Sequence, residues 1–176
     1  SEWDLLWVQH VATWSGAHEP MVRALRAGRL GIRSRPRDFS TVELPADYDA
    51  FLASMSPNRR QQVKRNTKKI LSQPGVEVRK LTTRDELGPA LEALFRLHGK
   101  RWRSVGKEGV FDRNLKEREF YECFAPEALA RGWLAIYTLF DGSDPKAVQI
   151  GYVYGRAFLQ LQEGFDPDYS PHVGNA

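Results

Sequence analysis

The hydrophobic pattern in the last third of the chain constrains the fold more than any other feature of the sequence. Three apolar segments occur there: Trp133–Phe140, Ala147–Tyr154 and Phe158–Phe165. In the first, odd and even positions are both mostly apolar, which is typical of a central strand buried on both faces. Short turn sequences, Asp141–Pro145 and Gly155-Arg156, separate them. Connections this short join antiparallel neighbours. The sequence therefore predicts a three-strand antiparallel meander and argues against a helical bundle.

A helix and a strand are predicted before this region. Ser56-Pro57 is a helix-start signal, because a serine oxygen accepts an unpaired backbone N–H and proline at the next position loses no hydrogen bond. We expect the helix to run to about Leu71 and to end before Gln73-Pro74-Gly75. The segment Val76–Leu81 alternates apolar and polar residues, which predicts a short strand.

Two further helices are expected between that strand and the meander. The first begins between Arg84 and Pro89, after a possible capping box at Thr83–Glu86, and the second covers about Arg113 to Arg131 with an interruption at Pro126. The first helix carries an apolar stripe at helical spacing. Its members are Leu87, Leu91, Leu94, Phe95, His98 and Trp102.

Composition narrows the class of protein. The 176 residues carry a formal net charge of +4, are 41% hydrophobic, and include one cysteine, Cys123, and four histidines. A single cysteine excludes an intrachain disulfide and, with so few histidines, argues against a zinc site, so no metal is expected. No segment approaches the ~18 uninterrupted apolar residues of a membrane span, and no signal-peptide pattern is present. These features predict a soluble, cytoplasmic protein.

Residues 1–45 differ from the rest of the chain in their pattern of apolar residues. Strands are predicted at Asp4–Val11 and, weakly, at Gly31–Arg33, but the residues between them are too poor in apolar side chains to build a core. We place a domain boundary here, with residues 46–176 as the main domain.

A run of cations follows Ser56-Pro57. It comprises Arg59, Arg60, Lys64, Arg65, Lys68 and Lys69. On a helix, Val63, Thr67 and Ile70 face inward, and the outward positions are Lys64, Arg65, Lys68 and Lys69. Such a stripe suits phosphate groups of a nucleic acid, a cofactor or a membrane surface, but a solvated helix face is the favoured explanation. No aromatic residue interrupts the run, which argues against a platform for stacking single-stranded bases.

Two residues are candidates for proton transfer. His98 is a possible general base, although its place on the apolar stripe favours a structural role. By strand parity Glu163 lies on the same face as Leu159 and Leu161, where apolar neighbours raise the pKa of a carboxyl group. A raised pKa suits a general base for an amine or hydroxyl. The alternative for Glu163 is a solvent-exposed side chain at a strand end.

Taken together, these segments resemble the second lobe of the BioF2-like or CelD-like acetyltransferases of the GNAT superfamily. The resemblance covers about Pro45 to Ala176. It rests on Leu52–Arg60 with its basic helix, on Leu97-His98 and Arg101-Trp102, on the meander, and on Gly164–Pro171. Residues 1–45 then resemble the tail of a preceding GNAT-like lobe with its linker, since such proteins usually carry two tandem lobes.

The resemblance implies a mixed α/β, GNAT-like fold with an antiparallel meander flanked by helices. In that fold the acyl-CoA donor lies beside the fourth strand, with its pyrophosphate held by the loop that follows. The implied donor-binding residues are Gln162, Gly164, Phe165, Ser170, Pro171, Val173, Gly174 and Asn175. The implied catalytic residues are Glu163, ahead of His98.

The phosphate loop departs from the superfamily pattern. The usual Arg/Gln-x-x-Gly-x-Gly sequence is absent, and His172 follows Ser170-Pro171 where this family commonly has glycine. The resemblance implies acyl-CoA as the donor. Because related Fem-type transferases use aminoacyl-tRNA, that donor is the alternative.

The implied function is transfer of an acyl group from acyl-CoA to an amine or hydroxyl of a saccharide or cell-envelope precursor, as in cellulose biosynthesis. The alternative is a nucleic-acid-binding or structural domain built on the basic helix, with nucleic acid the less favoured partner. The fold expects further elements after Ala176, so the predicted domain is incomplete and the activity is expected of the full-length protein. An uncovered fourth strand also predicts a homodimer.

Overall fold

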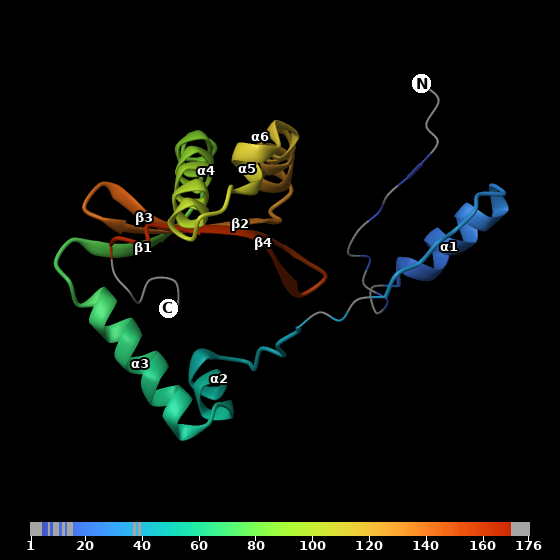
Figure 1. Ribbon diagram of the computed structural model, residues 1–176. Helices are drawn as coiled ribbons and strands as arrows, with labels where there is room; N and C mark the ends of the chain where they lie inside the picture. Colours follow the sequence, from blue (N-terminus) through green and yellow to red (C-terminus); the bar gives the residue numbers. More distant parts are fainter. Residues whose placement is uncertain are drawn as a thin grey trace. The chain divides into compact units, whose positions relative to one another are not determined.

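The computed structural model describes residues 5–6, 8, 11, 13, 16–36, 38 and 40–169. The chain divides into two compact units, Ser1–Leu44 and Pro45–Ala176. In the first, α1 spans His18–Ala27 and ends at Gly28 (Figure 1). This helix was not predicted, although Met21, Val22 and Leu25 lie at helical spacing.

Neither strand expected in the first unit is present among the described residues. Gly31–Arg33 is irregular, so that prediction is wrong. Leu5, Leu6 and Val8 are irregular and exposed, while most of the rest of Asp4–Val11 lies outside the described residues. Without neighbouring strands to accept their hydrogen bonds, short apolar runs do not become strands.

An antiparallel sheet forms the centre of the second unit. Its strands are β1 (Val76–Lys80), β2 (Leu134–Asp141), β3 (Asp144–Tyr154) and β4 (Ala157–Phe165), paired in the order β1-β2-β3-β4. The predicted meander is confirmed, and β1 extends it by pairing antiparallel with β2. Gly155 and Arg156, with φ of 55° and 68°, form the tight turn between β3 and β4.

Three helices cover one face of this sheet: α4 (Leu87–Ser104), α5 (Val110–Arg113) and α6 (Leu115–Ala130) (Figure 1). The expected stripe of α4 is buried against the sheet, apart from the half-buried Trp102. The largest fully buried side chains of the core come from both layers. They are Phe111, Leu94, Leu97, Ile136, Ile150 and Val148. The mixed α/β fold class expected from the sequence is therefore confirmed.

The interruption expected at Pro126 does not occur, because α6 continues through this residue. Proline inside a helix removes one backbone hydrogen bond. The neighbouring Tyr121, Ala125 and Ala128 are buried, and their packing holds the helix together across that gap.

Two helices precede the sheet, α2 (Tyr48–Ser54) and α3 (Pro57–Leu71), and lie on the other side of it from α4 (Figure 1). The predicted start and end of α3 are confirmed, with the Ser56 Oγ accepting a hydrogen bond from the Arg59 N–H at 3.4 Å. The Arg60 guanidinium donates to the carbonyl oxygens of Ala53 and Met55, which joins α3 to the end of α2.

Within the part of the chain that the structure describes, no helix has the length and hydrophobicity needed to cross a membrane.

Candidate functional site

Strand β4 has one free edge among the described residues, because β3 is its only partner in the sheet. A β-bulge divides the strand: Gln162 pairs with Ile150, whereas Gln160 pairs with Gly151, which leaves Leu161 as the extra residue. Beyond the bulge, side chains that simple alternation would place on one face of the sheet therefore lie on the other. Backbone N–H and C=O groups along the free edge pair with no other strand among the described residues.

The bulge overturns the parity argument for Glu163. Gly164 faces α4, since a Cβ there would contact the His98 backbone, so the adjacent Glu163 points to the opposite face of the sheet. Leu161 packs against the core on the helix side. The prediction that these two side chains share a face is wrong, because the extra residue shifts the alternation by one position.

The surroundings of the Glu163 carboxylate are polar, which also corrects the expectation of apolar neighbours. An Nη atom of Arg101 lies 2.5 Å from one carboxylate oxygen, and the Gln160 amide donates to the other at 3.0 Å. The Arg101 guanidinium also lies 4.7 Å from the centre of the Phe165 ring. Glu163 thus belongs to an ion-paired cluster at the edge of β4, and its side chain is 41% exposed.

Helix α4 lies in close contact with β4 at Gly164. A Cβ on this residue would lie 2.5 Å from the His98 backbone nitrogen and 3.0 Å from the Leu94 carbonyl oxygen. Side-chain carbons do not approach backbone atoms so closely, so only glycine permits the contact. This contact places α4 directly against the strand that carries Glu163.

His98 is buried in this contact region, with 3% of its surface exposed. Its Nε2 accepts a hydrogen bond from the Trp102 indole N–H at 2.9 Å, so the proton of the neutral ring is on Nδ1. Nδ1 has no hydrogen-bond partner among the described residues, and Gly109 packs against it. Burial, followed by the charge of Arg101, lowers the pKa of His98, although Asp112 and Glu163 act in the opposite direction.

A pocket of about 410 Å³ opens beside Gln162. It lies between the end of α4, the loop that follows it, α5 and strand β4. Its lining comprises His98, Trp102, Lys107, Glu108, Val110, Arg113 and Gln162. The pocket brings together His98 and Gln162, two of the residues that the sequence singled out, whereas Glu163 does not line it.

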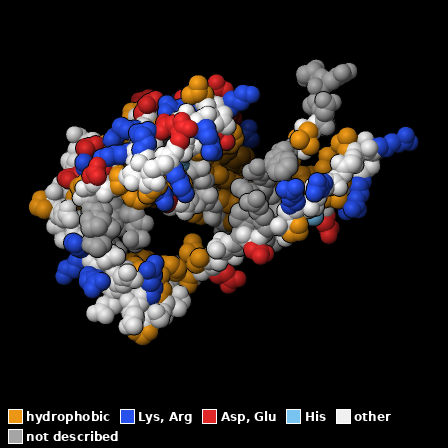
Figure 2. Space-filling view, viewed as in Figure 1, with side chains coloured by type: hydrophobic (Ala, Val, Ile, Leu, Met, Phe, Trp, Pro, Cys, Tyr) orange, Lys and Arg blue, Asp and Glu red, His pale blue; other side chains and the backbone are white. Residues whose placement is uncertain are grey.

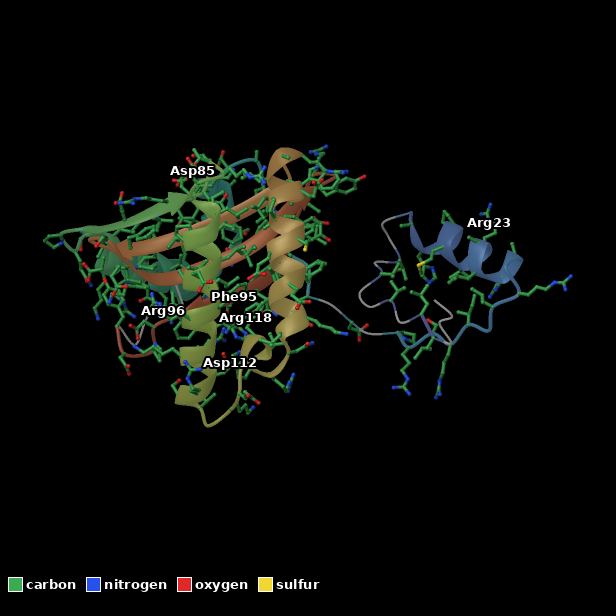
Figure 3. All side chains as sticks on the ribbon, turned by 90° about the horizontal axis from the view of Figure 1, so that it is seen from above. Arg23, Asp85, Phe95, Arg96, Asp112 and Arg118 are labelled. Atoms are coloured by element: carbon green, nitrogen blue, oxygen red, sulfur yellow. The ribbon has the colours of Figure 1, made fainter. Side chains whose placement is uncertain are left out.

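The wall formed by α5 is held in place by Asp112, which pairs with Arg103 of α4 at 2.7 Å and with Arg118 of α6 at 3.4 Å. Arg118 also donates to the Phe111 carbonyl and lies over the Phe95 ring (Figure 3). Because these contacts join three helices, the short α5 is anchored although four residues alone do not make a stable helix.

Two carboxylates follow the end of β4 and share one lysine. Lys100 Nζ lies 2.5 Å from Asp166 and 3.0 Å from Asp168. Burial tends to raise the pKa of Asp166, but the hydrogen bonds from Lys100 and from the Asp168 N–H outweigh it, so the pKa is lowered. The lysine thereby offsets part of the negative charge of the two carboxylates that precede the expected phosphate loop.

The expected donor-binding residues divide into two sets. Gln162, Gly164 and Phe165 lie on β4 at its free edge. Ser170, Pro171, Val173, Gly174 and Asn175 lie outside the described residues.

Three basic residues near the site, Arg101, Lys107 and Arg113, were given no role from the sequence, because their positions follow from tertiary contacts. The only local signal was the pair Arg101-Trp102, which lies close to His98 in the sequence.

A sequence model of the acetyltransferase (GNAT) domain matches residues 57–175. The chain belongs to the GNAT acetyltransferase family. The match covers α3, the sheet and the helices α4 to α6, and hence the whole of the candidate site. A search of curated proteins found no match.

GNAT domains in general use acyl-CoA as the acyl donor. Among the described residues, no group of three or more His, Cys, Asp or Glu side chains is arranged to hold a metal ion.

Proposed function

We propose that this GNAT domain transfers an acyl group from acyl-CoA to an amine or hydroxyl of a saccharide or cell-envelope precursor, as a BioF2-like or CelD-like enzyme. The observation that carries the proposal is the pocket at Gln162, which opens onto the edge of β4 where the donor of a GNAT domain lies. Support for the narrower family comes from the residues Leu52–Arg60 and Gly164–Pro171.

Glu163 is the proposed general base. Its carboxylate is 41% exposed at the edge of β4 and in this proposal accepts a proton from the acceptor, directly or through a water molecule. Donor binding supplies the thioester carbonyl, and backbone N–H groups between Gln162 and Phe165 are proposed to polarise it. The lone pair on His98 Nε2 is already occupied by the Trp102 N–H, so His98 has a structural role in this proposal.

The test is replacement of Glu163 by Gln, which keeps size and hydrogen bonding but removes basicity. Turnover, measured as release of the CoA thiol from a panel of acyl-CoA thioesters, is expected to fall by roughly 10²–10⁴. The affinity for acyl-CoA, measured by calorimetry, is expected to stay unchanged. Glu122→Gln, at an exposed position of α6, is the matched control and keeps wild-type turnover.

Two results would contradict the assignment. Wild-type turnover in Glu163→Gln would remove Glu163 from the mechanism. An equal loss in His98→Ala, with its circular dichroism spectrum unchanged, would transfer the role of base to His98. Absence of acyl-CoA binding by the intact protein would overturn the proposed activity itself.

A further inference from the structure

The pocket beside β4 contains two cations that form no ion pair with a described carboxylate. By contrast, three neighbouring cations on α4 each form an ion pair: Lys100, Arg101 and Arg103. Lys107, in the loop after α4, and Arg113, at the end of α5, line the pocket and form none with the described residues. Figure 2 shows the general pattern, in which basic and acidic side chains alternate over the part of the molecule that holds α4 to α6.

The charge of the lining is positive at neutral pH. Glu108 is its only carboxylate among the described residues, so the two cations against one anion leave +1. His98 adds no charge, because burial lowers its pKa and keeps the imidazole neutral. A positively charged concave site raises the local concentration of anionic ligands.

The remaining lining residues supply a surface for the uncharged part of a ligand. The half-buried Trp102 offers its indole ring, and Lys107 Nζ lies 5.7 Å from the ring centre. Gln162 offers an amide at the strand edge. The pocket thus combines cations from the loop and α5, a flat apolar surface, and a polar amide on β4.

We propose that this pocket binds an acceptor that carries an acidic group, a carboxylate or a phosphate, in addition to the amine or hydroxyl that receives the acyl group. The inference rests on the proposed acyl transfer and specifies its acceptor. Lys107 and Arg113 bind the acidic group. The body of the acceptor packs on Trp102, and its nucleophile is directed toward Gln162 and the edge of β4.

The experiment measures selectivity by calorimetry, with the donor absent. Three probes share one amino sugar: glucosamine, glucosamine 6-phosphate and muramic acid, which carries a carboxylate. The proteins are the wild type, Lys107→Gln, Arg113→Gln, the double variant, and Lys116→Gln as matched control. Lys116 is an exposed lysine on α6 that neither lines the pocket nor pairs with a described carboxylate.

The wild type and Lys116→Gln are expected to bind at least one acidic probe about tenfold or more tightly than glucosamine. The double variant is expected to lose that preference, and the stronger acidic probe tells whether the group is a phosphate or a carboxylate. Equal affinity for all probes, no binding of any, or a preference that survives in the double variant would overturn the inference. So would a loss of acetyl-CoA affinity in Lys107→Gln and Arg113→Gln, because the cations would then serve the donor.

Failure of the proposed function has a different signature. A protein that prefers acidic probes but neither binds nor consumes acetyl-CoA would refute acyl transfer while leaving the selectivity of the pocket established.

Discussion

At the residue scale, His98 is enclosed by contacts on several sides. Its backbone is covered by Gly164, its imidazole contacts Gly109 and Phe111, and its Nε2 is occupied by Trp102. A Cβ on Gly109 would lie 2.8 Å from Nδ1, so glycine is required there for close approach. Burial lowers the pKa of His98 and favours the neutral imidazole, and the Trp102 hydrogen bond to Nε2 leaves its proton on Nδ1.

The first prediction concerns the pH dependence of stability. Because burial lowers the folded pKa of His98 below its unfolded value of about 6.5, the unfolded state binds more protons as the solution is acidified. The free energy of unfolding should therefore fall as the pH drops below about 6.5. Denaturant titrations from pH 7 to pH 5 would measure this slope.

One variant provides the comparison for that slope. His98→Gln should show a shallower dependence on pH than the wild type, because it removes the titrating imidazole. A wild-type slope unchanged in His98→Gln would mean that His98 does not titrate differently on folding.

At the scale of elements, the contact between α4 and β4 positions the site. The second prediction is that Gly164→Ala lowers the free energy of unfolding by about 1–3 kcal/mol, because the added methyl group meets the backbone of α4 at 2.5 Å. Gly88→Ala is the matched control, since a Cβ there meets nothing within 4 Å. Equal stability of the two variants in urea titrations would contradict the tight contact.

The third prediction concerns α3, whose visible surface shows Lys and Arg but no Asp or Glu side chains (Figure 2). Lys64 and Lys68 are exposed, while Val63 and Ile70 face inward as expected. Replacing both lysines with Ala should leave acyl-CoA affinity unchanged and alter stability by less than about 0.5 kcal/mol. Salt-dependent binding of an RNA hairpin that disappears in this variant would instead favour the nucleic-acid alternative.

Local patterns explain which elements could be predicted. Ser56-Pro57 and the spacing from Leu87 to Trp102 define α3 and α4 because caps and periodicity act within a few residues. The bulge at Leu161 escaped prediction, since Leu159 to Gln162 alternates apolar and polar residues without a break across it. The partnership of Arg101 with Glu163 also escaped it, because it joins residues from separate elements through the fold.

At the scale of the whole molecule, apolar side chains remain exposed on the β3–β4 hairpin. Val153, Tyr154 and Phe158 are at least 40% exposed, next to the free edge of β4. The fourth prediction is that the protein dimerises through this hairpin, because exposed strand edges and apolar surface favour association.

Light scattering over a range of concentrations would test the dimer. Tyr154→Lys should shift the equilibrium toward monomer, because a lysine on an exposed hairpin opposes pairing. A monomeric wild type at every concentration would contradict the prediction.

The two glycines that contact His98 differ in what they depend on. Gly109 meets the imidazole, whereas Gly164 meets backbone atoms that every amino acid possesses. In evolutionary terms, the constraint at position 109 is epistatic: it holds while position 98 is histidine and relaxes if a smaller residue replaces it. The requirement for glycine at position 164 does not depend on the side chain at position 98, so a substitution there does not remove it.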